Sequence, residues 1–531
     1  MKTSMPPLRA SRREFLKASA LYAGALALAP LARGQAASAR AMAPPPRCLH
    51  PYPNQIAWGS GVQSLRRQVT LAVGRDADAG AVALMKDTWQ RFTLGSVKLK
   101  LARAAELDAS GFSLAGGRPP PLLPNATYAL TVDAAGIAAR GKDAAGLRHA
   151  WFTLLQLLEP AETAAGGLEF TLPQAAIQDW PALPFRGLHL CVFPETAPAM
   201  LEKAIRLAAF YKFTHVALEF WGQLRLHALR ELAWPGAWTK ARAGRLIAMA
   251  RGMGLEVIPM FNCWGHASAS RLKHGRHVVL DQNPRLAPLF EPDGWTWCLS
   301  NPRTQALLRS VCDELIAVAG PGRYFHIGCD EAYSHATCDR CRRADPVQLF
   351  AGHVNQLAAH LEQRGRRAIM WGDALLERGK WPAGFTANGT AAQPTHEALD
   401  RLSHRIVIAD WHYNVTQGDV PTLAHFRRHG FAALACPWNS AGNIRALARA
   451  AAASQSGLLM TTWHHLAQSI PLLAWTANCA WSANHAALGL RQMDGALMRT
   501  ASASHLRRLA PARGQFKRAG WNPFEQPAEV D

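Results

Sequence analysis

Apolar and polar positions follow two different patterns before and after residue 185. In the first part, short alternating runs typical of half-buried strands are interleaved with stretches of helical period. The expected strands are Gln68–Val73, Val97–Leu101 and Tyr128–Val132, and the expected helices are Ala81–Phe92 and Lys142–Leu158. This mixture predicts a small α+β domain over residues 54–176.

After Phe185, short apolar runs alternate with amphipathic stretches. The expected strands are Arg186–Cys191, His215–Phe220, Glu256–Phe261, Tyr324–Gly328, Ala368–Gly372, Ile406–Trp411, Phe431–Trp438 and Leu458–Trp463. The expected helices include Ala199–Phe210, Thr239–Gly252, Thr304–Val318, Val347–Arg364, Asn443–Ser454 and Ala467–Asn478. Eight strands alternating with helices over roughly 300 residues predict an α/β fold, a (β/α)8 TIM barrel, over residues 177–490. A helix and a basic tail are expected over 491–531.

The first 39 residues have a composition of their own. Arg12 and Arg13 precede an apolar stretch, Ala18 to Leu31, which is followed by the small residues Ala37 to Ala39. This resembles a twin-arginine signal peptide, with a Pro-rich linker over 40–53. The resemblance implies export through the twin-arginine translocase to the periplasm or the extracellular space. The alternative is an N-terminal anchor.

Charge and hydropathy exclude several classes of protein. The 49% of hydrophobic residues is too high for a disordered chain. Beyond residue 40, no apolar run reaches the roughly 18 residues of a membrane span, so no stable membrane insertion is expected after removal of the leader. The net charge of +21 falls to +16 without the leader, and the Lys and Arg residues are scattered. We therefore expect a solvated basic surface and no nucleic-acid partner.

The ten cysteines give little support for a metal site. Cys338-x-x-Cys341 is the only closely spaced pair, and zinc sites usually need four ligands. His335 could supply a third ligand, but a local disulfide or free thiols fit the spacing better. We expect no metal and no cofactor.

Candidate chemistry gathers at the carboxyl ends of the expected barrel strands, where such barrels carry their active sites. Six of the eight strands finish at or beside a tryptophan: Trp221, Trp264, Trp371, Trp411, Trp438 and Trp463. Core packing explains any one of them. Together they favour an aromatic wall that stacks against the apolar faces of a sugar ring.

The fourth strand is followed by two adjacent acids, Asp330 and Glu331. In a partly desolvated pocket two such carboxyls separate in pKa, one staying ionised while the other holds a proton. Glycoside cleavage needs this division, because it takes a proton for the leaving oxygen and a negative charge near the anomeric carbon.

These residues resemble glycoside hydrolase family 20, the β-N-acetylhexosaminidases. His326 to Glu331 is similar to the family's His-x-Gly-Gly-Asp-Glu signature, with Cys329 in place of the second Gly. The segments Ile177–Leu188, Val257–Ala267 and Tyr128–Leu158 resemble the first-strand entry, the third strand and the accessory domain. The resemblance covers residues 54 to 490.

The resemblance implies hydrolysis of terminal β-linked N-acetylhexosamine with retention, in which the substrate's own acetamido oxygen attacks the anomeric carbon. Asp330 would orient the acetamido group, and Glu331 would act as general acid and base. The substrate-binding residues that it implies are Arg186, His266, Trp371, Tyr413, Trp463 and, more weakly, Asp410 and Asp373. The alternative, non-functional interpretations are a structural role for Arg186, a turn cap for His266 and a buried strand position for His326.

The chain departs from the family pattern at several strand ends. Cys191 to Pro194 replace Asp-x-x-Arg, Leu218 to Trp221 replace a His-rich, acidic ending, and His465 stands where a Glu follows the last Trp. The last change leaves gluco or galacto preference open. Two other functions are weighed: a non-catalytic carbohydrate-binding relative, and a metal-dependent hydrolase using His266, Asp330, His464 or His465.

Overall fold

The structure is a computed structural model, and it describes residues 49–162, 168–267, 280, 283–463 and 466–482. The predicted signal peptide, most of the linker, His464, His465 and the predicted segment 491–531 lie outside the described residues. Within the described part of the chain, no helix is both long and apolar enough to cross a membrane.

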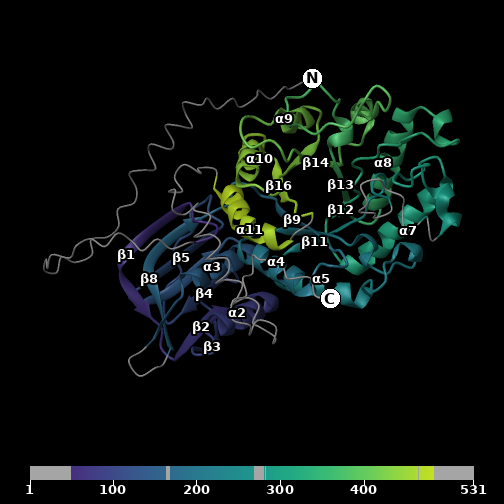
Figure 1. The fold of residues 1–531 in the computed structure, drawn as a ribbon. Helices are drawn as coiled ribbons and strands as arrows, with labels where there is room; N and C mark the ends of the chain where they lie inside the picture. The colour runs from purple at the N-terminus through teal and green to yellow at the C-terminus, as the bar shows by residue number, and fades with distance from the viewer. Residues whose placement is uncertain (1–48, 163–167, 268–279, 281–282, 464–465, 483–531) are drawn as a thin grey trace, which may run out of the picture. The chain divides into compact units, whose positions relative to one another are not determined.

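The N-terminal domain is a mainly antiparallel sheet with two helices on it (Figure 1). The order of the strands is β1-β8-β5-β6-β4-β2-β3, with β7 paired to β8. The strands are β1 Gln55–Ser64, β2 Gln68–Gly74, β3 Lys98–Ala104, β4 Gly111–Leu114, β5 Tyr128–Asp133, β6 Gly136–Gly141, β7 Glu159–Glu162 and β8 Leu168–Asp179. The helices are α2 Ala79–Phe92 and α3 Ala144–Leu157. Their buried rings, Trp89 and Trp151, lie 5.7 Å apart in the core between the helices and the sheet.

Eight parallel strands then close into a barrel, which confirms the predicted fold class. The strands are β9 Arg186–Cys191, β10 His215–Glu219, β11 Glu256–Met260, β12 Tyr324–His326, β13 Arg367–Trp371, β14 Val407–Trp411, β15 Ala432–Cys436 and β16 Gly457–Met460. β9 pairs with both β10 and β16, so the barrel has no free edge. Each strand overlaps the one predicted for it.

Helices surround the barrel, as Figure 1 shows for α7 to α10. They are α4 Pro198–Phe210, α5 Lys240–Gly252, α7 Pro302–Ala319, α8 Pro346–Glu362, α9 Pro421–Arg428, α10 Ala441–Ala453 and α11 Leu466–Trp481. Four of them begin with a proline, which lacks the N–H that a first helical turn leaves unpaired. Short 3₁₀ helices lie in the loops after the strands: η2 Trp221–Gln223, η3 Arg230–Leu232, η4 Pro284–Leu289, η5 Cys341–Arg343, η6 Asp373–Leu375 and η7 Thr395–Arg401.

Side chains alternate between the barrel interior and the surrounding helices. Ile369 and Trp371 of β13 and Ala409 of β14 pack inside the barrel, while Met370 and Ile408 belong to the core outside it. This alternation follows from the two-residue period of a strand. It decides which residues at the strand ends can reach a ligand at the mouth of the barrel.

A buried carboxylate, Asp179, joins the N-terminal sheet to the barrel. It ends β8 and accepts hydrogen bonds from Tyr128 Oη of β5 (2.6 Å) and from Trp481 Nε1 of α11 (2.7 Å). Lys212 Nζ, from the turn after α4, lies 3.2 Å from it. β8 thus reaches three residues beyond the predicted domain boundary, and its last residue holds the two domains together.

Arg186 belongs to the same junction, and its predicted role in sugar binding is wrong. It lies at the amino-terminal start of β9, is 3% exposed, and donates to the carbonyl oxygens of Lys212 (2.8 Å) and Leu183 (2.6 Å). Its guanidinium lies over the ring of Trp481 at 4.9 Å. These contacts place the side chain at the end of the barrel opposite the strand ends that carry Asp330 and Glu331.

Candidate active site

The Asp330–Glu331 pair follows β12 through a tight reversal of the backbone. Gly328, Cys329 and Glu331 have φ values of 65°, 73° and 48°, in the left-handed region that favours glycine. A Cβ at Gly328 would lie 2.2 Å from Asn262 Oδ1, so this position requires glycine. The reversal buries Asp330, at 4% exposed, and leaves the Glu331 side chain about one-third exposed. Strain of this kind is typical of functional sites.

His266 bridges the two carboxylates, as predicted for a residue near the dyad. Its Nε2 lies 3.3 Å from Asp330 Oδ2 and 3.2 Å from Glu331 Oε2. The preceding Gly265 allows this approach, because a Cβ there would lie 1.9 Å from the Asp330 carbonyl oxygen. One imidazole therefore sits between both acids.

The dyad and His266 shift one another's pKa values. Burial alone would lower the pKa of His266, but Asp330 and Glu331 outweigh it and raise the value to about 10. Burial raises the pKa of Asp330, although the charge of His266 opposes the shift. Burial also acts to raise the pKa of Glu331, yet hydrogen bonding to His266 and the charge of His266 lower it overall. The free site thus contains an imidazolium with Glu331 ionised beside it.

Asp373, a weaker candidate from the sequence, is a third carboxyl of this site. Its Oδ2 accepts from the Glu331 backbone N–H (3.2 Å) and Asn388 Nδ2 (2.7 Å), and its Oδ1 accepts from Trp411 Nε1 (3.1 Å). Burial and then the charge of Asp330 raise the pKa of Asp373 to about 7. Asp373 therefore fixes the Glu331 backbone and the Trp411 ring at once.

The predicted residues Trp371, Tyr413 and Trp463 lie together. Trp371 is fully buried inside the barrel, and its ring centroid is 5.6 Å from that of Trp463. Trp463 Nε1 donates to Tyr413 Oη at 2.7 Å. Burial raises the pKa of Tyr413, and the charge of Asp330 adds to the shift. Trp411 and Trp438 flank Tyr413, with centroids 4.9 and 5.2 Å away.

Asp410 does not belong to the site, and its predicted role in substrate binding is wrong. It is followed by Trp411, which packs inside the barrel, so the alternation of β14 turns Asp410 outward. Its Oδ2 accepts from Thr422 Oγ1 of α9 at 2.6 Å, and its Oδ1 lies 2.9 Å from His412 Nε2. Asp410 attaches a helix to the barrel wall.

One tryptophan of the predicted aromatic wall is replaced by another. Trp264 packs into the outer core against Phe350 and His335, with centroids 4.5 and 5.1 Å away. Trp295, from the long loop between β11 and α7, packs against His266 with centroids 4.4 Å apart and donates from Nε1 to the Glu331 carbonyl oxygen at 2.8 Å. Reading only the strand ends missed Trp295. The Trp-Thr-Trp sequence inside a loop of that length was the available signal.

A polar network closes the barrel below the dyad. Glu219, 1% exposed at the end of β10, accepts from Asn262 Nδ2 (2.6 Å) and lies 2.9 Å from His189 Nε2. The Cys191 thiol lies 3.4 Å from the same carboxylate. The sequence analysis treated this strand end only as a departure from the family pattern.

Three groups in the described residues could hold a metal ion by their composition. The dyad with His266 is the first. In the second, which joins His189, Cys191 and Glu219, both oxygens of Glu219 are already engaged by other side chains. The third joins Glu291, Cys298, Cys338 and Cys341. His335, which was weighed as a possible third ligand, is not in this group, and its Nε2 lies 2.9 Å from the Pro346 carbonyl oxygen.

Comparison with known proteins extends this description. The profile described as "Glycosyl hydrolase family 20, domain 2" matches residues 48–180, and "Glycosyl hydrolase family 20, catalytic domain" matches residues 213–437. A beta-hexosaminidase of Porphyromonas gingivalis is 27% identical over 346 residues, covering 58% of this chain and 43% of the relative. A beta-hexosaminidase of Vibrio furnissii is 24% identical over 372 residues, covering 61% and 57%. The chain thus spans about half the length of these relatives.

A solved structure shows the same fold. The GH20 exo beta-N-acetylglucosaminidase of Vibrio harveyi, in complex with N-acetylglucosamine, superposes with a TM-score of 0.66 at 17% identity. The superposition covers 87% of this chain and 78% of that one. A TIM barrel with paired carboxyls among aromatic rings at the carboxyl ends of its strands is an arrangement typical of glycosidases. With both domain profiles matched in order, the chain belongs to glycosyl hydrolase family 20.

Proposed function

We propose that this protein is an exported β-N-acetylhexosaminidase that removes terminal β-linked N-acetylhexosamine from glycans, with retention of configuration. The observation that carries the proposal is the Asp330–Glu331 dyad bridged by His266 within the matched catalytic domain. The beta-hexosaminidase names of two relatives support the same substrate class.

In the proposed reaction, the acetamido oxygen of the substrate attacks the anomeric carbon while Glu331 protonates the departing glycosidic oxygen. Asp330 accepts the acetamido N–H and stabilises the positive oxazolinium intermediate that forms. Glu331 then removes a proton from the water that opens the intermediate, and the sugar is released with its original configuration. In this proposal, Tyr413 Oη, which accepts a hydrogen bond from Trp463 Nε1, holds the acetamido group.

In the free site the protons are distributed between Asp330 and Glu331 differently from what the reaction requires. Without substrate, His266 lowers the pKa of Glu331, while burial raises that of Asp330. A bound sugar lowers the pKa of Asp330, because its N–H stabilises the ionised carboxylate. It raises the pKa of Glu331, because its ring removes water from that side chain. Substrate binding therefore protonates the general acid in this proposal.

The aromatic side chains supply the sugar-binding walls. Trp411 and Trp463 both contact Tyr413, and the buried Trp371 contacts Trp463. We propose that the exposed parts of the Trp411 and Trp463 rings stack on the apolar faces of the pyranose, with His266 fixing the dyad beside it.

The proposed export rests on the leader sequence. Replacing Arg12 and Arg13 by Lys should retain the protein in the cytoplasm of a host with a twin-arginine translocase, as fractionation and immunoblotting would show. Equal export of the double variant would refute this route.

Activity is tested on an aryl 2-acetamido-2-deoxy-β-glucoside, with the plain β-glucoside alongside. We expect turnover of the acetamido substrate only, and a loss of at least about 10²-fold in kcat for Glu331→Gln. The matched control Glu362→Gln changes an acid of α8 that is about one-third exposed and should leave kcat unchanged. Binding of N-acetylglucosamine without turnover would instead support a carbohydrate-binding relative. Turnover of both glucosides would refute catalysis by the substrate's acetamido group.

A further inference from the structure

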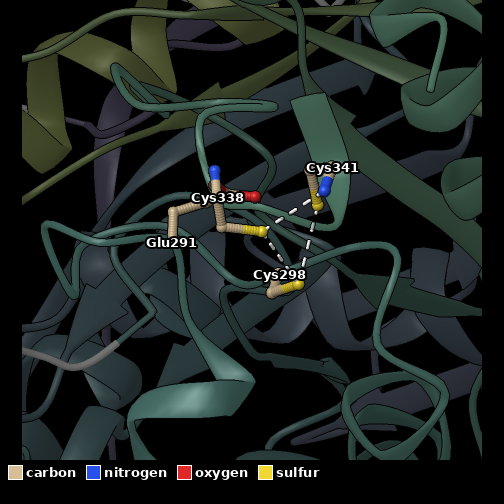
Figure 2. A group of neighbouring side chains, drawn as sticks. All are labelled: Glu291, Cys298, Cys338 and Cys341. Atoms are coloured by element: carbon tan, nitrogen blue, oxygen red, sulfur yellow. Dashed lines mark hydrogen bonds between the residues drawn. The ribbon is translucent and has the colours of Figure 1, made fainter. Parts of the chain in front are cut away.

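Three cysteines and a glutamate from two different loops meet away from the dyad (Figure 2). Glu291 and Cys298 come from the loop between β11 and α7, and Cys338 and Cys341 come from the loop between β12 and α8. One oxygen or sulfur atom of each residue lies within 4.8 Å of all the others. Figure 2 shows the three sulfur atoms turned toward one another.

The sulfur spacing fits ligands around one metal ion. Cys298 Sγ lies 3.5 Å from Cys338 Sγ and 3.5 Å from Cys341 Sγ. A tetrahedral zinc with bonds of about 2.3 Å places its sulfur ligands roughly 3.8 Å apart. A disulfide requires about 2.05 Å, and it would leave the third thiol without a partner of its own kind.

Glu291 supplies the fourth ligand atom. The residue is 2% exposed, and its Oε2 accepts from the backbone N–H groups of Thr337 (3.0 Å) and Cys338 (2.6 Å). Its Oε1 is buried and has no hydrogen-bond partner. A buried carboxylate oxygen left unpaired is costly, and a cation would satisfy it.

The surrounding backbone supports negative charge on the sulfur atoms. The Cys341 N–H donates to Cys338 Sγ at 3.4 Å, within a turn closed by the Arg342 N–H and the Cys338 carbonyl oxygen (3.0 Å). Three thiolates, one carboxylate and a divalent ion leave a net charge of −2. Arg340, Arg342 and Arg343 lie beside the cysteines in sequence, and Arg342 pairs with Asp339.

We propose that Glu291, Cys298, Cys338 and Cys341 bind one zinc ion as a closed structural site. Thiolate ligands with one carboxylate favour zinc over Mg²⁺ or Ca²⁺, and four protein ligands leave no open position for catalysis. The site is not evident from the sequence, because Cys298 and Glu291 lie 40 and 47 residues before Cys338.

The ion would tie together the two loops that build the candidate active site. The first loop also carries Trp295, which packs against His266, and the second begins at the dyad itself. Direct contact between the loops is already present in the hydrogen bond from Trp295 Nε1 to the Glu331 carbonyl oxygen. The zinc therefore fixes the distance between the two loops without touching substrate.

Metal analysis of the purified full chain, prepared without chelator, tests the proposal. We expect about one zinc per chain, falling below a tenth of that in Cys298→Ser and Cys338→Ser. Cys338 is partly exposed, so its variant should fold normally. Cys479→Ser, which changes a buried cysteine of α11, is the matched control and should retain the zinc.

Cobalt substitution identifies the ligands independently of any activity. Co²⁺ added to the zinc-free chain should give the sulfur-to-metal charge-transfer band and the d–d bands of a tetrahedral thiolate site. Glu291→Gln should keep the sulfur band and weaken Co²⁺ binding at least tenfold. Zinc removal should also increase hydrogen exchange in residues 283–301 and 330–345.

Two results would overturn the proposal. One is a chain that binds neither Zn²⁺ nor Co²⁺ while all thiols are reduced. The other is a disulfide among Cys298, Cys338 and Cys341 in the purified protein, found by alkylation of the unreduced chain and mass spectrometry. Because none of these readouts uses a glycoside substrate, they are independent of the proposed hydrolase activity.

Discussion

Cys329 holds a backbone conformation that favours glycine, directly before the dyad. Its φ is 73°, it is fully buried, and its thiol lies 3.4 Å from the Ile327 carbonyl oxygen. A non-glycine residue in this region costs about 1–2 kcal/mol. The side chain therefore adds strain beside Asp330, and packing of the thiol in the core offsets part of it.

The strain predicts an unusual order of stability between two variants. At most positions a Gly variant is less stable than the Ala variant by about 0.5–1 kcal/mol, but at a residue with positive φ the Gly variant is the more stable one. We expect Cys329→Gly to exceed Cys329→Ala in free energy of unfolding by about 1 kcal/mol, measured by urea denaturation. An Ala variant as stable as the Gly variant, or more so, would contradict this account.

His266 predicts how stability depends on pH. Its pKa is raised from 6.5 to about 10 by the two carboxylates, so its charge stabilises the fold fully below pH 6.5. That contribution is lost as the pH rises through 10. We expect the stability difference between wild type and His266→Gln to be on the order of a few kcal/mol at pH 6 and to shrink toward pH 10. A difference that stays constant over this range would show that the imidazole is uncharged.

At the scale of elements, the alternation of β14 separates a site residue from a structural one. Asp410 points to α9, whereas Trp411 packs inside the barrel and Tyr413 contacts Trp463. Asp410→Asn should lower the free energy of unfolding by about 1–3 kcal/mol and change kcat/KM less than twofold. Tyr413→Phe should do the opposite, with kcat/KM reduced about tenfold and stability nearly unchanged. Urea denaturation and steady-state kinetics would distinguish them, and equal kinetic losses in both variants would refute the assignment.

The sequence predicted the elements better than the site. All eight barrel strands were predicted because buried parallel strands form short apolar runs between helices of clear period. The dyad, His266 and the Trp371–Tyr413–Trp463 group were found at strand ends. Arg186 was assigned wrongly because it begins β9 and therefore lies at the amino end of the barrel, away from the dyad. Asp410 was assigned wrongly because the face of β14 on which it lies was not predicted, and the two-residue period of a strand decides that face. Glu291 and Cys298 join the cysteine cluster only because two loops contact each other in the fold. The spacing of residues along the sequence does not show such a contact.

At the scale of the whole molecule, stability depends on the junction around Asp179. Its carboxylate, Lys212 and Tyr128 are all fully buried, and burial lowers the pKa of Lys212 to about 8 although Asp179 opposes the shift. Removing one partner of a buried pair leaves the other charge uncompensated. We expect Asp179→Ala to lower the free energy of unfolding by about 3–5 kcal/mol.

The control for this variant is an ion pair on the surface. Asp87 pairs with Arg91 one turn along α2 and is about half exposed, so Asp87→Ala should cost less than about 0.5 kcal/mol. Calorimetry should also show separate transitions for the N-terminal domain and the barrel in Asp179→Ala, because the variant loses their shared hydrogen bonds. A single transition at an unchanged Tm would contradict the role given to Asp179.

The same junction can be completed only late in the synthesis of the chain. Asp179 leaves the ribosome about 300 residues before Trp481, its partner in α11. Tyr52 likewise lacks a partner until Asn478 is synthesised, because the Tyr52 backbone N–H donates to the Asn478 side chain at 2.8 Å. Until α11 emerges, the Asp179 carboxylate lacks its partner Trp481, and the part of the barrel that α11 covers is exposed. The N-terminal domain can therefore form early, but its docking on the barrel is among the last events of folding.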